Sequence, residues 1–278
     1  MKKIIVAFDG LRFSESAMQY AFYFARRCNA QIVGVFLNES TKLGYAVYEA
    51  MVKQSVSGKD IVKEIDKTDA DTISHAIDTF ESGCREAKLD YIIHRDKANA
   101  LKELLHETVF ADLLIIDAWE TFSYIEGNLP GWFIKNVLHD AHCPVIVVPK
   151  KFKPVNRLVL LYDGSPSSMH AIKMLNYILP EMKDMEAKLV HVGDETSSLQ
   201  LPGDELLKEW MKKHYAKVLY NLLKGYENEI PTILANEDKD ILVVAGAYHR
   251  SNMSMRFHKS LADLLMRAVD APIFIAHT

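Results

Sequence analysis

The sequence predicts an α/β fold built from two similar domains, each with a doubly wound parallel sheet. Two observations predict it. Short apolar segments alternate with amphipathic helical ones, the order in which helices cover both faces of a parallel sheet. The chain also repeats itself, so its two halves are two copies of one unit. The matching segments are 6–10 (VAFDG) with 160–164 (LLYDG), 112–116 (DLLII) with 240–244 (DILVV), and 143–148 (CPVIVV) with 271–276 (APIFIA).

The repeat predicts domains at residues 1–150 and 154–278, each long enough to bury a core of its own. The first copy is 26 residues longer, as the offsets between the matching segments show. Most of this surplus lies between the second and third strands, in a polar segment at 38–59 and a long helical pattern that ends near Lys88. This additional segment could form a lid over a ligand, or it could contact a partner.

Each copy begins with a buried strand and a capped helix. Residues 3–8 form an apolar run rich in β-branched residues, which indicates a strand buried on both faces. Ser14 is the predicted N-cap of the next helix, and Ser165 with Pro166 repeats the pattern. Later strands are predicted at 31–37, 90–94, 112–117 and 144–148, and at 187–192, 217–222, 240–245 and 272–276, with helices near 99–106, 203–216 and 229–235.

Composition and charge exclude several classes of function. Hydrophobic residues make up 49% and charged residues 25% of the chain, as in ordinary globular domains. The net charge is −4, with −4 in residues 1–150 and 0 in residues 151–278, so no basic excess favours a nucleic-acid partner. No apolar run approaches the roughly 18 residues of a membrane span, and the N-terminal run is too short for a signal peptide. We therefore expect a cytoplasmic protein without a membrane partner.

Two aspartates mark the place where function is expected. Asp9 and Asp163 each end the first strand of a copy. In doubly wound sheets, ligands bind beyond the carboxyl ends of the strands. Each carboxylate could accept a hydrogen bond from a ligand there, or it could cap the following helix. Both roles are open at this point.

These residues resemble the universal stress protein family in its tandem form, in which one chain carries two domains. The likeness extends over essentially the whole chain and rests on the matching segments together with Ser165 and the loop after the fourth strand. It implies two Rossmann-like domains of the adenine nucleotide alpha hydrolase-like type, related by a pseudo-two-fold axis. The final strands of the two copies would then pair, which would cover edges that are otherwise bare.

Members of this family that bind ATP carry G-x-x-G, nine residues and G-[S/T] after the fourth strand, because glycines let the backbone approach phosphates. In the second copy Gly246 and Ser260 keep the first and last positions, whereas His249 and Lys259 replace the other two glycines. The first copy has Ala118, Thr121, Gly131 and Trp132 at the four positions.

The same two loops differ strongly in charge. Residues 246–260 contain three bases and no acid, for a charge of +3, whereas residues 118–132 contain two glutamates and no base, for −2. An anion should therefore bind the second copy, where Arg256 and Lys259 partly compensate for the lost glycines. The predicted ligand is an adenine nucleotide such as ATP. By resemblance Asp163 and Val192 line its adenosine pocket and Gly246 and Ser260 its phosphate end, with His249, Arg256 and Lys259 in the same loop.

Three functions remain open from the sequence. The first is a stress-response regulatory protein that binds a small anionic ligand and acts on a protein partner or through self-association. The second is a slow ATP hydrolase or a phosphate-transferring enzyme, and the third is an interaction scaffold that binds no nucleotide. No Walker loop and no dinucleotide-binding fingerprint is present. Neither a catalytic base nor a set of metal ligands is identified, since His139 and His142 lack a third ligand nearby.

Overall fold

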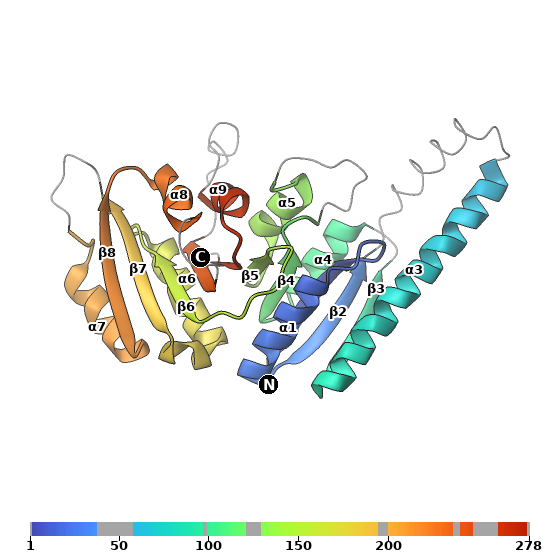
Figure 1. The fold of residues 1–278 in the computed structure, drawn as a ribbon, viewed down its shortest axis with the longest axis horizontal. Coiled ribbons are helices and arrows are strands. Elements are labelled where there is room, and N and C mark those ends of the chain that lie inside the picture. Colours follow the sequence, from blue (N-terminus) through green and yellow to red (C-terminus); the bar gives the residue numbers. More distant parts are fainter. Residues whose placement is uncertain are drawn as a thin grey trace. The chain divides into compact units, whose positions relative to one another are not determined.

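The computed structural model gives an α/β fold in both halves of the chain (Figure 1). The contacts between residues divide the chain into two compact units, Met1–His142 and Cys143–Thr278. Within the described residues, no helix is both long enough and apolar enough to cross a membrane. The structure describes residues 2–37, 58–96, 99–120, 129–193, 200–235, 240–246 and 261–276.

The first unit contains a parallel sheet in which β1 lies between β2 and β4. The chain therefore leaves β1 toward one side and returns to its other side, which is the doubly wound arrangement that the sequence predicts. Helices α1 and α3 contact each other, as do α4 and α5. The elements are β1 (Lys3–Asp9), α1 (Glu15–Cys28), β2 (Gln31–Leu37), α3 (Gly58–Ala87), β3 (Tyr91–Asp96), α4 (Ala100–Thr108), β4 (Leu113–Asp117) and α5 (Trp132–Asp140).

The second unit repeats this order of strands and helices, with β6 between β7 and β9. Its strands run parallel except for β5, which pairs with β10 in the antiparallel direction. The strands are β5 (Val145–Val148), β6 (Arg157–Leu161), β7 (Glu186–Gly193), β8 (Lys217–Lys224), β9 (Ile241–Gly246) and β10 (Ile273–Ala276). The helices are α6 (Pro166–Ile178), α7 (Asp204–His214), α8 (Ile230–Ala235) and α9 (Leu261–Ala268), with the 3₁₀ helices η1 (Pro180–Asp184) and η2 (Glu227–Glu229).

The final strands of the two copies, β5 and β10, pair with each other, and every residue of both is buried. The antiparallel register matches Ile273 with Val147 and Ile275 with Val145. Because of this pairing, the contacts assign β5 to the second unit, whereas the sequence repeat divides the chain at residues 150–154. Neither strand is left with a bare hydrophobic edge on this side.

Both predicted N-caps are confirmed. The Ser14 hydroxyl oxygen accepts a hydrogen bond from the Ala17 N–H at 3.2 Å, and that of Ser165 accepts one from the Ser168 N–H at 3.2 Å. Pro166 occupies the first turn of α6, where its missing N–H costs no intrahelical bond. Each cap fixes where the loop after the first strand ends, so it also fixes the edge of the crevice described below.

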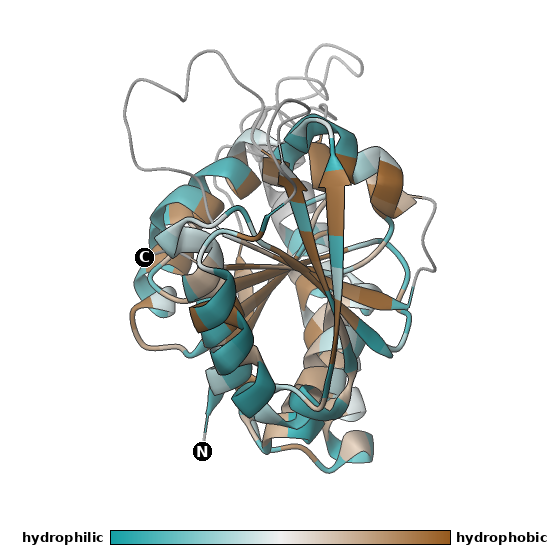
Figure 2. Ribbon diagram, turned by 90° about the vertical axis from the view of Figure 1, so that its left-hand side faces the viewer, coloured by the Kyte–Doolittle hydropathy of each residue, from teal (hydrophilic) through white to brown (hydrophobic). Residues whose placement is uncertain are grey.

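The core of each unit is its sheet. The described residues of β4 and β6 are buried almost without exception. Figure 2 shows the strands mainly in the hydrophobic colour, between helices that carry hydrophilic residues. In the first unit an aromatic cluster joins sheet and helix, because the Phe8 ring lies 5.0 Å from that of Phe36 and 5.5 Å from that of Phe80 in α3. This cluster anchors the long helix α3 on the strands.

Candidate functional site

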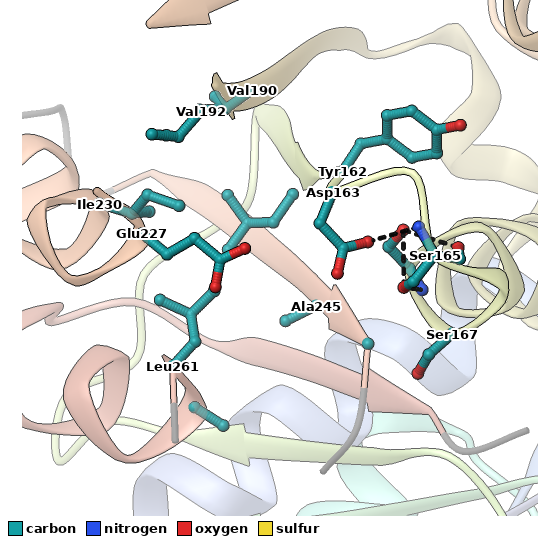
Figure 3. Close-up of a pocket in the computed structure, with 14 residues that line it drawn as sticks. Tyr162, Asp163, Ser165, Ser167, Val190, Val192, Glu227, Ile230, Ala245 and Leu261 are labelled. Atoms are coloured by element: carbon teal, nitrogen blue, oxygen red, sulfur yellow. Dashed lines mark hydrogen bonds between the residues drawn. The ribbon is translucent and has the colours of Figure 1, made fainter. Parts of the chain in front are cut away.

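The second unit contains a cavity of about 180 Å³ at the carboxyl ends of β6, β7 and β9. This is the crevice in which a doubly wound sheet binds ligands, since β6 is the strand from which the chain continues to either side. Figure 3 shows the side chains around it. They are Leu161, Tyr162, Asp163, Ser165, Ser167, Ser168, Val190, Val192, Glu227, Ile230, Ala245, Gly246, Leu261 and Ala262.

Asp163 follows β6 and is exposed to the crevice. One of its carboxylate oxygens accepts a hydrogen bond from the Ser165 N–H at 2.8 Å. Burial acts to raise the pKa of Asp163, but hydrogen bonds from Ser165 and Ser168 outweigh it and hold that pKa below its ordinary value. The carboxylate is therefore ionised at neutral pH and can accept hydrogen bonds from a ligand.

The lowered pKa of Asp163 makes part of the stability depend on pH. A carboxyl group with a depressed folded pKa stabilises the fold above its unfolded pKa of about 3.9, and that contribution is lost as the pH falls through the folded value. We expect Asp163→Asn to melt below the unaltered protein at neutral pH, with the gap closing in acid. Thermal unfolding against pH checks this, and Asp184→Asn, on exposed η1, should show no such trend. A gap independent of pH would contradict the assignment.

The turn that carries Asp163 is held from both sides. The Tyr162 hydroxyl donates a hydrogen bond to the Pro202 carbonyl at 2.8 Å, and the Tyr162 carbonyl accepts one from His191 Nδ1 at 2.8 Å. At Gly164 the backbone φ is 86°, and a Cβ there would come within 2.5 Å of Pro202 Cβ. The turn therefore needs glycine at this position. These contacts set the direction of the Asp163 carboxylate before any ligand arrives.

Gly246 ends β9 on the far side of the cavity, against the first turn of α6. A Cβ at this position would lie 2.9 Å from Ser167 C, Ser167 Oγ and Ser168 N. Helix α9 begins at Leu261, which also lines the cavity. The starts of two helices thus border one space, and helix N-termini favour anions because their first N–H groups lack intrahelical partners.

The opposite wall of the cavity is formed by apolar side chains and one acidic side chain. Val190 and Val192 project from β7 and Ile230 from the start of α8, and together they could take a flat ring. Glu227, in η2, points into the same space beside Ile230 (Figure 3). Glu227 belongs to none of the motifs predicted from the sequence. Its position just beyond the carboxyl end of β8 is the signal that could have found it.

The structure brings together three of the predicted site residues, Asp163, Val192 and Gly246, around the cavity. The other four lie outside the described residues. They are His249, Arg256, Lys259 and Ser260.

In the first unit, acidic side chains lie at the carboxyl ends of the matching strands, β1 and β4. Asp9, Asp117 and Glu120 are all buried. Glu120 Oε1 lies 3.5 Å from the Asp9 N–H, and the Ser14 hydroxyl donates to Asp117 Oδ2 at 2.6 Å. Asp117 takes the place that the small Ala245 has in the second unit. Three buried carboxylates disfavour an anion, as the charge difference between the two loops suggests. Here Ala118 is buried.

The remaining first-copy motif positions lie at the start of α5 or outside the described residues. Gly131 is the N-cap of α5 and makes no side-chain capping bond. Trp132 begins α5 with 70% of its surface exposed. Thr121 lies outside the described residues. Across the described part of the chain, no three His, Cys, Asp or Glu side chains gather as a metal site would require.

Comparison with known proteins decides the family. The model of the universal stress protein family matches residues 1–149, which is more than half of the chain. The chain belongs to this family. Universal stress protein Slr1230 of Synechocystis is 20% identical over 290 residues, an alignment that covers 98% of this chain and 99% of the relative.

Two solved structures are similar to this chain over nearly its whole length. A universal stress protein from Archaeoglobus fulgidus superposes with a TM-score of 0.66 at 16% identity, over 99% of this chain and 96% of its own. The functionally unknown protein PA1789 from Pseudomonas aeruginosa gives a TM-score of 0.63 at 10% identity, over 100% and 92% of the two chains. At these identities the likeness establishes the fold of this universal stress protein, and the site has to be argued from its own residues.

Proposed function

We propose that this universal stress protein is a regulatory binding protein that holds an adenine nucleotide in its second unit. The observation that carries the proposal is the cavity at the carboxyl ends of β6, β7 and β9. It combines an apolar wall, an ionised acceptor in Asp163 and the starts of two helices. An apolar slot with a few convergent polar groups is the usual form of a small-molecule site.

The cavity favours one orientation of such a ligand. The base would lie against Val190, Val192 and Ile230, and the ribose hydroxyls would donate hydrogen bonds to Asp163. The phosphates would then point toward Gly246 and the start of α9. In the sequence, that helix is preceded directly by the basic segment of residues 246–260. A negative group at that end is favoured by both the helix N-terminus and the basic residues.

The protonation of the described groups supports binding over hydrolysis. An aspartate whose pKa is lowered is a weak base, so Asp163 is poorly suited to take a proton from an attacking water. Burial, together with the nearby Asp163 carboxylate, raises the pKa of Tyr162, and its hydroxyl already donates to Pro202. Both groups are suited to hold a ligand in place.

The proposal predicts that Asp163→Ala weakens AMP and ATP binding by about 10-fold or more, because a hydrogen bond to a charged acceptor is lost. The measurement is calorimetric titration of the full chain after bound small molecules have been removed by denaturation and refolding. Asp184→Ala makes the same change on exposed η1, outside the residues that line the cavity, and should keep the original affinity.

The same preparation separates the other functions. Phosphate release from ATP that Asp163→Ala abolishes would favour the hydrolase. A folded protein that releases no nucleotide and binds neither AMP nor ATP would contradict the proposal and favour the scaffold.

A further inference from the structure

Two carboxylates face each other across the cavity of the second unit. Asp163 lies at the end of β6, and Glu227 lies in η2 beyond β8. Figure 3 shows both side chains directed into the space between them. None of the residues that line the described cavity is a lysine or arginine. The part of a ligand that sits between these acids must therefore supply hydrogen-bond donors and cannot be its phosphate group.

Glu227 differs from the glutamate two residues later in the same turn. The Glu229 carboxylate accepts a hydrogen bond from the Tyr226 N–H at 3.3 Å, so it caps η2 and serves the local fold. Within the described part of the chain, the Glu227 carboxylate makes no hydrogen bond or ion pair. A carboxylate that points into a cavity without such a partner is available to a ligand.

The surroundings of Glu227 identify the kind of donor. Ile230 and Val192 form the apolar wall beside it, where a flat heterocyclic base would rest. The ribose of the same ligand would face Asp163, which leaves the polar edge of the base for Glu227. Adenine presents an amino group on that edge, which donates to a carboxylate. Hypoxanthine presents a carbonyl oxygen at the same atom, which would repel it.

We propose that Glu227 is a specificity-determining residue that selects amino purines over oxo purines in this pocket. The inference rests on the proposed function, because it assumes that the base lies in the apolar slot. A site that hydrogen-bonds one donor discriminates against an analogue that replaces the donor with an acceptor, because two acceptors then face each other.

AMP and IMP form the test pair, since IMP replaces the 6-amino donor of AMP with a carbonyl acceptor and differs otherwise only in the proton on the adjacent ring nitrogen N1. In calorimetric titrations of the full chain, we expect AMP to bind about 10- to 100-fold more tightly than IMP. In Glu227→Gln the preference should fall to within about 3-fold, because the amide can turn to offer either a donor or an acceptor. Glu181→Gln, on exposed η1, is the matched control and should keep the full preference.

Each outcome has a distinct meaning. A preference for AMP that Glu227→Gln leaves unchanged would overturn this inference and leave the proposed function intact. Equal affinities of the unaltered protein for AMP and IMP would do the same. Failure of the unaltered protein to bind AMP, ATP or IMP would overturn both. Circular dichroism of each variant establishes that the fold is retained, so a loss of binding can be attributed to the pocket.

Discussion

Replacing Phe80 with alanine should lower the free energy of unfolding of the first unit by about 3–5 kcal/mol, as for other buried phenylalanines. The side chain is fully buried in α3, and its ring lies 5.5 Å from that of Phe8 and 5.9 Å from that of Phe36. It also covers Gly34, where a Cβ would come within 2.7 Å of the ring. Removal of the ring leaves a cavity between α3 and the sheet, and the cavity can close only if the helix or the strands move.

Urea unfolding followed by circular dichroism measures this loss. The matched control is Phe110→Ala, since Phe110 follows α4 with 64% of its surface exposed. That change should alter the free energy of unfolding by no more than about 0.5 kcal/mol. If the two variants unfold at the same urea concentration, the aromatic cluster does not anchor α3 on the sheet.

The second large effect is expected from Gly246→Ala. The new methyl group would lie 2.9 Å from two backbone atoms of the first turn of α6, Ser167 C and Ser168 N, and neither can rotate away as a side chain could. Overpacking of this kind typically costs about 1–3 kcal/mol. The start of α6 would have to shift, and the Ser165 N–H that bonds Asp163 would shift with it. We therefore expect both a less stable second unit and an AMP affinity lowered by about 10-fold or more.

Gly131→Ala provides the comparison within the same chain. Gly131 precedes α5 with φ −66° and ψ 167°, a conformation that alanine adopts readily. Its replacement should cost about 1 kcal/mol or less and should leave AMP binding unchanged. Equal stability losses in the two variants, or full AMP affinity in Gly246→Ala, would show that the first turn of α6 does not need the close approach of β9.

The sequence was sufficient for most of the fold because its elements leave local patterns. A strand buried on both faces requires a short apolar run, so the predicted strand at 3–8 agrees with β1, Lys3–Asp9. A serine hydroxyl is a favoured cap at a helix start, so Ser14 and Ser165 could be predicted from the sequence. Strand ends also locate the crevice, which is why Asp163 could be predicted to line it, whereas Gly246 was predicted from the family resemblance of the loop after the fourth strand.

The rest of the site depends on contacts between distant segments, which no local pattern records. Glu227 and Glu229 are chemically identical and two residues apart, and only the path of η2 shows which of them enters the cavity. The carboxylates of the first unit also depend on distant segments, since Glu120 reaches Asp9 and Asp117 reaches Ser14 only through the pairing of β1 with β4. The predicted basic residues, Arg256 and Lys259, lie outside the described residues.

The pairing of β5 with β10 has a consequence for any attempt to separate the halves. A fragment that begins at residue 154 would contain a complete repeat but would lack β5, so β10 would become an outer strand whose backbone N–H and C=O groups on that side have no strand partner. Antiparallel association of two identical strands is self-complementary, so two such fragments could join through β10. Within the whole chain, β5 takes the place that a second copy of β10 would take in such an association.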